Sequence, residues 1–374
     1  MRVVARALAL AALIIGAPSR PARADEVPTL QPPAAEAGDI SAEFQSEQFL
    51  GDLNKPVGLA FRIGVGETVA PELYFAEAAA GRVSRVRLGA GQQPAPFIEG
   101  FPTRASKSLN GAEIGPLGLA FITRTKLAVG EAGAGPGVDL VRVYSLGEGP
   151  ASLRYDQTDH VVGPVKPTRQ PAQGGFYALA LLADNALVVS SLEAGETADG
   201  GQPVPGGPWL LKATVNANKA ADLQRLASSS SPGPPGPFAG VTFHSDPNLP
   251  YVVASAPGVA DESPDSALAW FSLQSGRVAM ALPSGLRDVM AVAYSQSGQL
   301  YVADASWADP AAGGVYRIDA AMVDGLQACR PVKIAAVPCP AALAFGPDGK
   351  LYVSSWGDPD DDASGQVVRI TGKF

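Results

Sequence analysis

Six short apolar phrases recur along the chain, and each has the same order of residue types. A small residue is followed by an aliphatic one, a second small residue and a large apolar one; the phrases begin at Gly58, Gly118, Ala178, Gly240, Ala291 and Ala342. Successive starts are 60, 60, 62, 51 and 51 residues apart. After each phrase come a turn and a second apolar run, at Leu73–Phe75, Leu127–Val129, Leu187–Val189, Tyr251–Val253, Leu300–Val302 and Leu351–Val353. Short apolar runs bounded by turn residues predict β-strands.

A third strand follows the second run, for example at Gly314–Ile318 and Gln366–Ile370, and a weaker fourth strand precedes the next phrase. Four short antiparallel strands repeated six times are typical of a six-bladed β-propeller. The small residues fit this architecture, because only small side chains leave room where the first strands of neighbouring blades meet near the axis. The sequence therefore predicts an all-β, six-bladed β-propeller over residues 39–374.

The last repeat ends after its third strand, at Ile370, so its fourth strand must come from elsewhere in the chain. The segment Ala42–Leu50 precedes the first repeat, in the place of a fourth strand. We predict that this N-terminal strand, at about residues 42–50, pairs with Gln366–Ile370 and closes the ring. Closure would remove strand edges that otherwise invite aggregation.

The N-terminus has the features of a secretory signal peptide. Arg2 and Arg6 stand at the start of a short apolar run, and Ala22-Arg23-Ala24 gives a small-x-small cleavage site. We expect a signal peptide at residues 1–24, a flexible leader at 25–38, and a periplasmic or secreted mature protein. The apolar run is shorter than the roughly 20 residues that cross a bilayer, and no later segment reaches that length, so no membrane span is expected.

Charge narrows the class of partner. Removing residues 1–24 takes away four arginines and no acids, which moves the net charge from −8 to −12. This balance argues against nucleic acid, because phosphate binding needs clustered Lys and Arg. It favours a cation or an uncharged partner, and we expect a small molecule, a glycan or a protein as the ligand.

Cys329 and Cys339 are the two cysteines of the chain. An oxidising compartment favours a disulfide, but a strand predicted at Pro331–Val337 would hold their Cα atoms farther apart than the roughly 7 Å that a disulfide spans. The sequence leaves both states open.

One face of the propeller carries the long, variable loops that follow the second strands, at Glu196–Pro208, Pro257–Asp265, Trp307–Gly313 and Trp356–Gly365. We call it the loop-rich face, and rigid strands that carry variable loops are the usual setting of a binding surface. One residue at the end of each second strand occupies a matching position, and these six are the predicted ligand-binding residues: Glu77, Glu131, Ser191, Ser255, Asp304 and Ser355.

The three carboxylates of that set, Glu77, Glu131 and Asp304, are the candidate metal ligands. Carboxylates brought together repel unless a cation or a proton lies between them, and one divalent cation such as Ca²⁺ suits oxygen ligands. In the alternative, each acid caps its own loop by accepting a backbone N–H. The sequence does not decide between the two.

Catalytic motifs give little support for an enzyme. The nucleophile-elbow, zinc-helix and phosphate-loop patterns are missing from the sequence. Of the two histidines, we expect His244 to be structural, whereas His160 lies in a connection that could reach the loop-rich face.

The phrases Leu343-Ala-Phe-Gly-Pro-Asp-Gly-Lys-Leu-Tyr-Val-Ser-Ser-Trp-Gly357 and Gly365-Gln-Val-Val-Arg-Ile-Thr371 resemble the closing blade of the ScyD/ScyE-type exported propellers. Gly58-Leu-Ala-Phe61 and Gly118-Leu-Ala-Phe121 are similar to that family's opening blades, and the resemblance covers roughly residues 45–371. Related phrases occur in NHL-type, gluconolactonase-like and quinoprotein sugar-dehydrogenase-like propellers. The resemblance implies an exported propeller and leaves its reaction open.

The function favoured by the sequence is that of a ligand-binding or scaffolding protein acting through its loop-rich face. The resemblance adds two alternatives. A metal-dependent hydrolase of the lactonase type would hold its ion with Glu77 or Glu131 and with Asp304. A quinone-dependent sugar dehydrogenase would need a histidine and basic residues, for which His160 with Arg287 or Lys107 is the available set. Both alternatives are analogies at the level of the fold.

Overall fold

The computed structural model describes residues 41–64, 70–89, 91, 93–147, 152–182, 186–197, 209–216, 219–220, 223–227, 237–244, 246 and 248–374. The predicted signal peptide at 1–24, the leader at 25–38 and most of the loop at 196–208 lie outside these ranges. The described part of the chain is built from β-strands, with one short 3-10 helix at Pro310–Ala312. None of its helices has the length and apolar character needed to cross a membrane.

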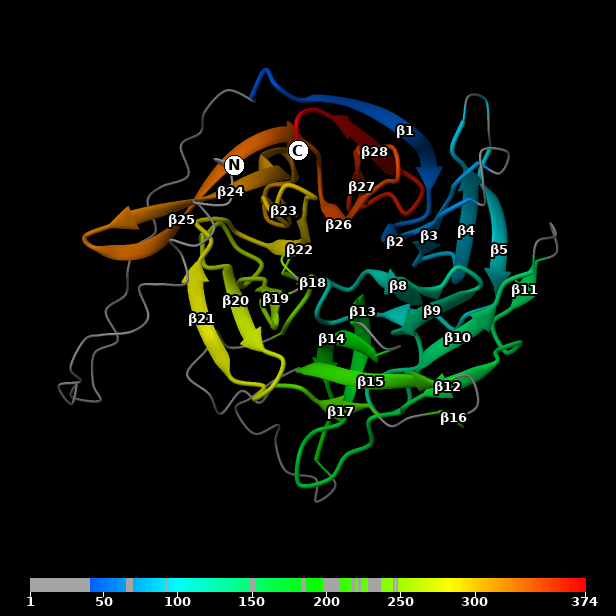
Figure 1. Cartoon of the computed structure of the whole chain (residues 1–374). Coiled ribbons are helices and arrows are strands. Elements are labelled where there is room, and N and C mark those ends of the chain that lie inside the picture. Colours follow the sequence, from blue (N-terminus) through cyan, green and yellow to red (C-terminus); the bar gives the residue numbers. More distant parts are fainter. Residues whose placement is uncertain are drawn as a thin grey trace. The chain divides into compact units, whose positions relative to one another are not determined.

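Six small sheets stand in a ring and form a six-bladed β-propeller, as predicted (Figure 1). Each sheet is one blade, and its first strand lies nearest the axis. Blade 1 contains β2 (Pro56–Arg62), β3 (Glu72–Glu77), β4 (Arg82–Arg87) and β5 (Ala95–Glu99). Blade 2 contains β8 (Pro116–Thr123), β9 (Lys126–Glu131), β10 (Val141–Ser145) and β12 (His160–Val162). Blade 3 contains β13 (Gln173–Leu182), β14 (Ala186–Ala194), β15 (Leu210–Asn216), β16 (Lys219–Ala220) and β17 (Gln224–Arg225).

Blades 4 to 6 have four strands each. Blade 4 contains β18 (Val241–Phe243), β19 (Tyr251–Ala256), β20 (Ala267–Ser272) and β21 (Val278–Pro283). Blade 5 contains β22 (Val289–Tyr294), β23 (Leu300–Asp304), β24 (Gly314–Val323) and β25 (Leu326–Ala336). Blade 6 contains β26 (Pro340–Phe345), β27 (Leu351–Ser355), β28 (Gly365–Thr371) and β1 (Gln45–Leu53). Two small additions complete the described strands: β11 (Leu153–Arg154), parallel to β5, and a hairpin of β6 (Arg104–Ala105) with β7 (Glu113–Ile114).

The repeated phrases lie in the first strands, where neighbouring blades meet. A Cβ atom added to Gly118 would lie 2.8 Å from the carbonyl oxygen of Tyr177 in the next blade. A Cβ atom added to Gly240 would lie 2.6 Å from the Cα of Ala291. Backbone therefore packs directly against backbone at these points, which explains the small residue at the start of each phrase.

Ring closure occurs as predicted. Strand β1 pairs antiparallel with β28, from Gln45 opposite Thr371 to Leu53 opposite Gly365. Blade 6 is thus assembled from both ends of the propeller segment. Phe44, which is 5% exposed, adds an aromatic anchor, because its ring lies 5.3 Å from that of Phe374.

The question that the sequence left open for the cysteines has a clear answer. Cys329 lies in β25 opposite Ala320, Cys339 lies just before β26, and both are buried and free. Burial raises the pKa of each thiol to about 12, so both stay protonated at neutral pH and are unreactive.

The closing strand generates the first prediction. Phe44→Ala should lower the free energy of unfolding by about 3–5 kcal/mol, because a buried aromatic ring is lost where β1 is anchored. The matched variant Glu47→Gln, in the same segment, removes an exposed ion pair with Arg369 and should cost less than about 1 kcal/mol. Equilibrium denaturation of both variants checks this, and equal losses would contradict the anchoring role of β1.

Candidate functional site

Strand register defines the two ends of the ring. The start of each first strand pairs with the end of the second strand, for example Val289 with Asp304 and Pro340 with Ser355. The loops that follow the second strands therefore leave from the end at which the first strands begin. This end is the loop-rich face, and we call the other end the opposite face.

The six predicted ligand-binding residues occupy matching positions, one per blade. Each lies at or near the end of a second strand, and each is at most 2% exposed: Glu77, Glu131, Ser191, Ser255, Asp304 and Ser355. The alignment of repeats therefore placed them correctly within the blades. Their side chains are engaged inside the protein.

Glu77 is held by a dense set of donors. Arg82 binds both carboxylate oxygens, with Nε 2.7 Å from Oε1 and Nη2 2.9 Å from Oε2. The hydroxyl of Ser84 and the backbone N–H of Asn54 donate to the same carboxylate. Burial alone would raise the pKa of Glu77, but these hydrogen bonds outweigh burial and hold the pKa below its ordinary value.

The other two carboxylates are also occupied. Glu131 is paired with Arg142 and accepts the backbone N–H of Leu140 at 3.2 Å. Asp304 accepts the N–H of Asp288 at 2.7 Å and the hydroxyl of Ser306 at 3.2 Å. Burial raises the pKa of both acids despite these donors.

The three serines connect backbone segments within their own blades. The hydroxyl of Ser191 donates to the carbonyl of Gly174 at 2.7 Å. That of Ser255 accepts the N–H of Gly240 at 2.9 Å, and Ser355 accepts the N–H of Gly357 at 3.1 Å. These hydroxyls fix the ends of strands and the loops beside them.

This geometry bears on the predicted metal. The three carboxylates belong to blades 1, 2 and 5, and their oxygens already accept hydrogen bonds. In the part of the chain that the structure describes, no group of three or more His, Cys, Asp or Glu side chains is arranged to hold a metal ion. A Ca²⁺ ion held by these acids stays a prediction. Their contacts are of the kind that the loop-capping alternative predicts.

The channel is filled at the loop-rich end by an apolar cluster, which we call the axial plug. All six blades contribute to it from the first strand or the residues just before it: Val57, Leu117, Tyr177, Ala239, Met290 and Ala341. The hydroxyl of Tyr177, in blade 3, donates to the carbonyl of Ala341, in blade 6, at 2.7 Å. Blades 3 and 6 are opposite each other in a ring of six, so this bond crosses the axis.

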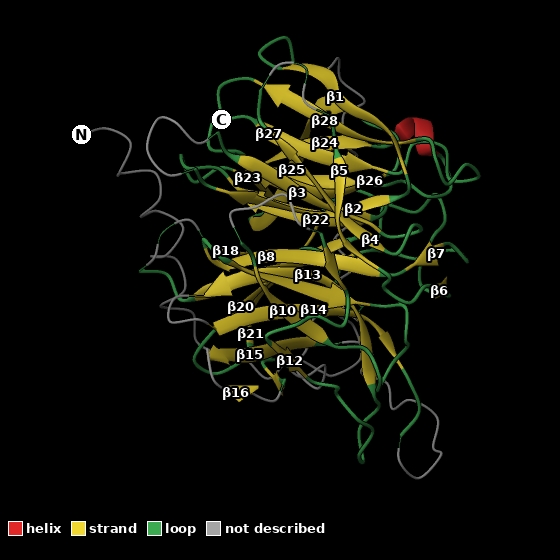
Figure 2. Ribbon diagram, turned by 90° about the vertical axis from the view of Figure 1, so that its right-hand side faces the viewer, coloured by secondary structure: helices red, strands yellow, loops and turns green. Residues whose placement is uncertain are grey.

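A strap from the connection between blades 1 and 2 adds to the axial plug. It consists of residues 101–115 and contains the β6–β7 hairpin, which Figure 2 shows on the same side as the short helix at Pro310–Ala312. Leu109 and Ile114 of the strap are buried in the plug. Glu193 of blade 3 anchors the strap, because it pairs with Arg104 and accepts the hydroxyl of Ser106 at 2.6 Å.

Sequence reasoning missed Asp288, the residue before the first strand of blade 5. Its side chain accepts the backbone N–H of Trp307 at 2.8 Å and is buried close to Asp304. Burial raises its pKa to about 7, and the neighbouring carboxylates add to this effect. The aligned repeats contained a signal for this position. A charged residue stands directly before the first strand in two blades, Lys55 in blade 1 and Asp288 in blade 5.

The histidines do not form a catalytic centre with the predicted basic residues. His160 lies in β12, the outermost strand of blade 2, opposite Val143. This position is away from the axis, and burial lowers the pKa of the imidazole. His244 packs its ring 5.0 Å from that of Tyr294, in the structural role expected for it. Arg287 pairs with Asp309 at 3.4 Å.

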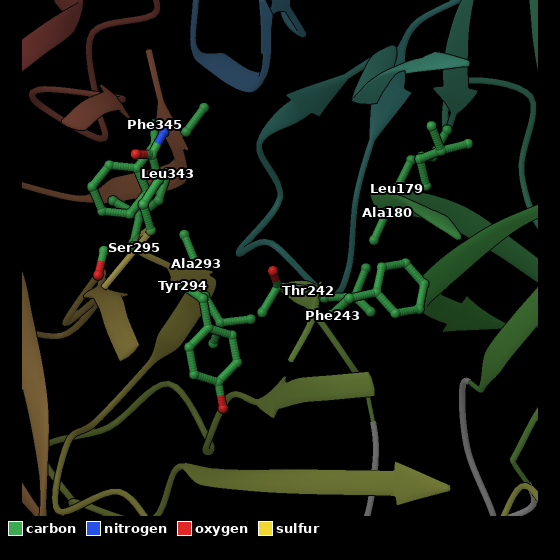
Figure 3. Close-up of a pocket in the computed structure, with 14 residues that line it drawn as sticks. Leu179, Ala180, Thr242, Phe243, Ala293, Tyr294, Ser295, Leu343 and Phe345 are labelled. Carbon is green, nitrogen blue, oxygen red and sulfur yellow. The ribbon is translucent and has the colours of Figure 1, made fainter. Parts of the chain in front are cut away.

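A cavity of about 520 Å³ opens at the opposite face, where the first strands end (Figure 3). We call it the axial cavity. The innermost strands of blades 3, 4, 5 and 6 line it, through residues such as Leu179, Thr242, Ala293 and Leu343. The axial plug lies at the other end of the same strands, and the cavity is open to solvent at the opposite face.

Asp288 generates a prediction about pH. Its pKa is about 7 in the folded chain and close to 4 in an unfolded one, so between these values only the folded state keeps the proton. The free energy of unfolding should therefore fall as pH rises from 4 to 7, with a slope from this group of at most about 1.4 kcal/mol per pH unit. In Asp288→Asn this part of the slope should vanish, while Asp309→Asn, on the neighbouring loop that contains Trp307, should keep it. Denaturation at several pH values checks this; an unchanged slope in Asp288→Asn would contradict it.

Comparison with known proteins shows the fold and no closer kinship. No protein-family model matches the chain, and no curated protein matches it. Among solved structures it is similar to a protein of Thermus thermophilus described as an oxidoreductase (glucose dehydrogenase), with 17% identity and a TM-score of 0.57 over 88% of this chain and 100% of that one. It is also similar to the PQQ-bound aldose sugar dehydrogenase of Streptomyces coelicolor, with 14% identity and a TM-score of 0.56 over 91% and 100%.

A protein described as belonging to a gluconolactonase family reaches a TM-score of 0.49, at 14% identity over 89% of this chain and 94% of that one. At such identities, the likeness to the two dehydrogenases establishes that the chain shares their propeller fold. The closer resemblance to ScyD/ScyE-type propellers stays a prediction.

Proposed function

We propose that this chain is a binding protein that takes up a small molecule in the axial cavity. The observation that carries the proposal is the cavity itself, a concave space of about 520 Å³ on the propeller axis. Small-molecule sites are typically concave, largely apolar and about 300–1,000 Å³ in volume. The axial cavity has a volume in this range, and its lining combines apolar side chains with hydroxyl and amide groups.

The walls of the cavity are rigid. They are built from β13, β18, β22 and β26, and each of these strands contacts the next one around the axis. The floor is the axial plug, in which Tyr177 is bound across the ring to Ala341. A rigid, preformed pocket costs little ordering free energy when a ligand binds.

The proposal keeps the binding role predicted from the sequence and moves its centre to the opposite face. At the loop-rich face, the carboxylates and hydroxyls of the six predicted residues already have partners in the protein. Binding of a protein or a glycan by the loops there remains a prediction, and so do the lactonase and quinone-dehydrogenase alternatives. We also propose that the mature protein is periplasmic or secreted, on the strength of the signal-peptide features of residues 1–24.

A fluorescence titration tests the binding proposal. N-phenyl-1-naphthylamine, an uncharged probe that brightens in apolar surroundings, should bind the purified protein. Thr242→Trp places a large side chain in the cavity and should weaken binding at least about tenfold, because the probe and the indole compete for one space. The matched variant Thr123→Trp, at the exposed end of β8 and outside the cavity lining, should bind like the parent.

A second cavity-filling variant, Ala293→Leu, provides the same test if Thr242→Trp does not fold. Melting temperatures identify the folded variants. Equal probe binding by the parent and by a folded cavity-filling variant would overturn the proposal, and so would the absence of binding to the parent.

A further inference from the structure

The axial cavity is lined by uncharged residues. Its wall is formed by consecutive residues of four first strands and of the turn after β22: Leu179–Leu181, Val241–Phe243, Val292–Gln296 and Leu343–Phe345. Aliphatic, aromatic, hydroxyl and amide side chains are present, and Asp, Glu, Lys, Arg and His are absent from this lining. An ion that entered would lose water without gaining an opposite charge.

The titratable groups at the wall are neutral as well. Burial raises the pKa of Tyr294, whose hydroxyl accepts a hydrogen bond from Trp270 Nε1 at 3.3 Å. His244 packs against the far side of the same ring at 5.0 Å, and burial lowers the pKa of its imidazole. At neutral pH both groups therefore present no charge to the cavity.

The same wall supplies polar groups without charge. Strands β13, β18, β22 and β26 each have a partner strand on one side and form the inner edge of their sheets. In an antiparallel pair every second residue directs its backbone N–H and C=O away from the partner strand. On these four strands such groups face the axis, where they need a hydrogen-bonding partner. The hydroxyl of Thr242 adds a donor and acceptor between them (Figure 3).

We infer that the axial cavity selects uncharged molecules that combine an apolar body with hydrogen-bonding groups. This inference rests on the proposed binding function. Apolar atoms of the ligand pack against the apolar part of the lining, and its polar groups bond to the strand edges and to Thr242. An ionised carboxylate or sulfonate is disfavoured, because an ion that loses part of its water in the cavity gains no opposite charge in return. The net charge, −8 for the full chain and −12 without residues 1–24, adds to the rejection of anions.

Two probes that differ by one charged group test the selectivity. N-phenyl-1-naphthylamine is uncharged, and 8-anilino-1-naphthalenesulfonate has the same ring system with an added sulfonate. The parent protein should bind the uncharged probe at least about tenfold more tightly. Thr242→Lys supplies the missing positive charge and should shift the affinity ratio at least about tenfold toward the sulfonate, while Thr123→Lys should leave the ratio unchanged.

A competition assay tests the polar half of the inference. In displacing N-phenyl-1-naphthylamine, 1-naphthol should be more potent than naphthalene, because its hydroxyl can bond to the free strand edges. Equal potency would show that the strand edges do not form hydrogen bonds with the ligand.

The two proposals fail in different ways. If both probes bind equally and Thr242→Trp displaces both, the cavity is a binding site and its selectivity for uncharged molecules is wrong. If Thr242→Trp, with an unchanged melting temperature, displaces neither probe, the binding function itself is wrong. A ratio that stays the same in a folded Thr242→Lys variant also overturns the role of charge.

Discussion

Closure of the ring by β1 and β28 is the constraint on which the other features of this protein depend. The axial plug joins Val57, near one end of the described chain, to Ala341, near the other. The axial cavity likewise draws its wall from four successive blades. The axial plug depends on closure, because loop-closure entropy opposes a contact between such distant parts of the chain until the last blade is complete. A single strand pairing thus stabilises the plugged end of the channel.

Much of this fold could be predicted from the sequence, because its repeats encode local geometry. The phrases beginning at Gly118 and Gly240 mark places where backbone meets backbone, and a fourth strand for blade 6 had to be found before residue 58. The alignment even placed Glu77 and Asp304 at equivalent positions. Their partners could not be predicted in the same way. Arg82 reaches Glu77 from the next strand, and backbone N–H groups reach Asp304 from a loop whose path is set by tertiary packing.

The candidate site was harder to foresee because its residues also serve the fold. Thr242 and Ala293 belong to the repeated phrases, and in the sequence they indicate packing against a neighbouring blade. That the ends of these strands enclose a space depends on how six blades meet, which a pattern along one strand does not specify. Leu109 gave no signal either, since the strap becomes part of the core only when Glu193 holds it against blade 3. The raised pKa of Asp288 results from burial, which also depends on the assembled ring.

The axial plug, with its bond from Tyr177 to Ala341, lies between the loop-rich face and the axial cavity. A substitution in the loops of the loop-rich face therefore alters that surface without reshaping the axial cavity. A substitution in the cavity lining likewise leaves the loops in place. Such a division lets two recognition tasks diverge independently in one propeller. It also gives a practical route to hybrid proteins, in which the loops of one propeller are grafted onto another propeller that keeps its own axial cavity.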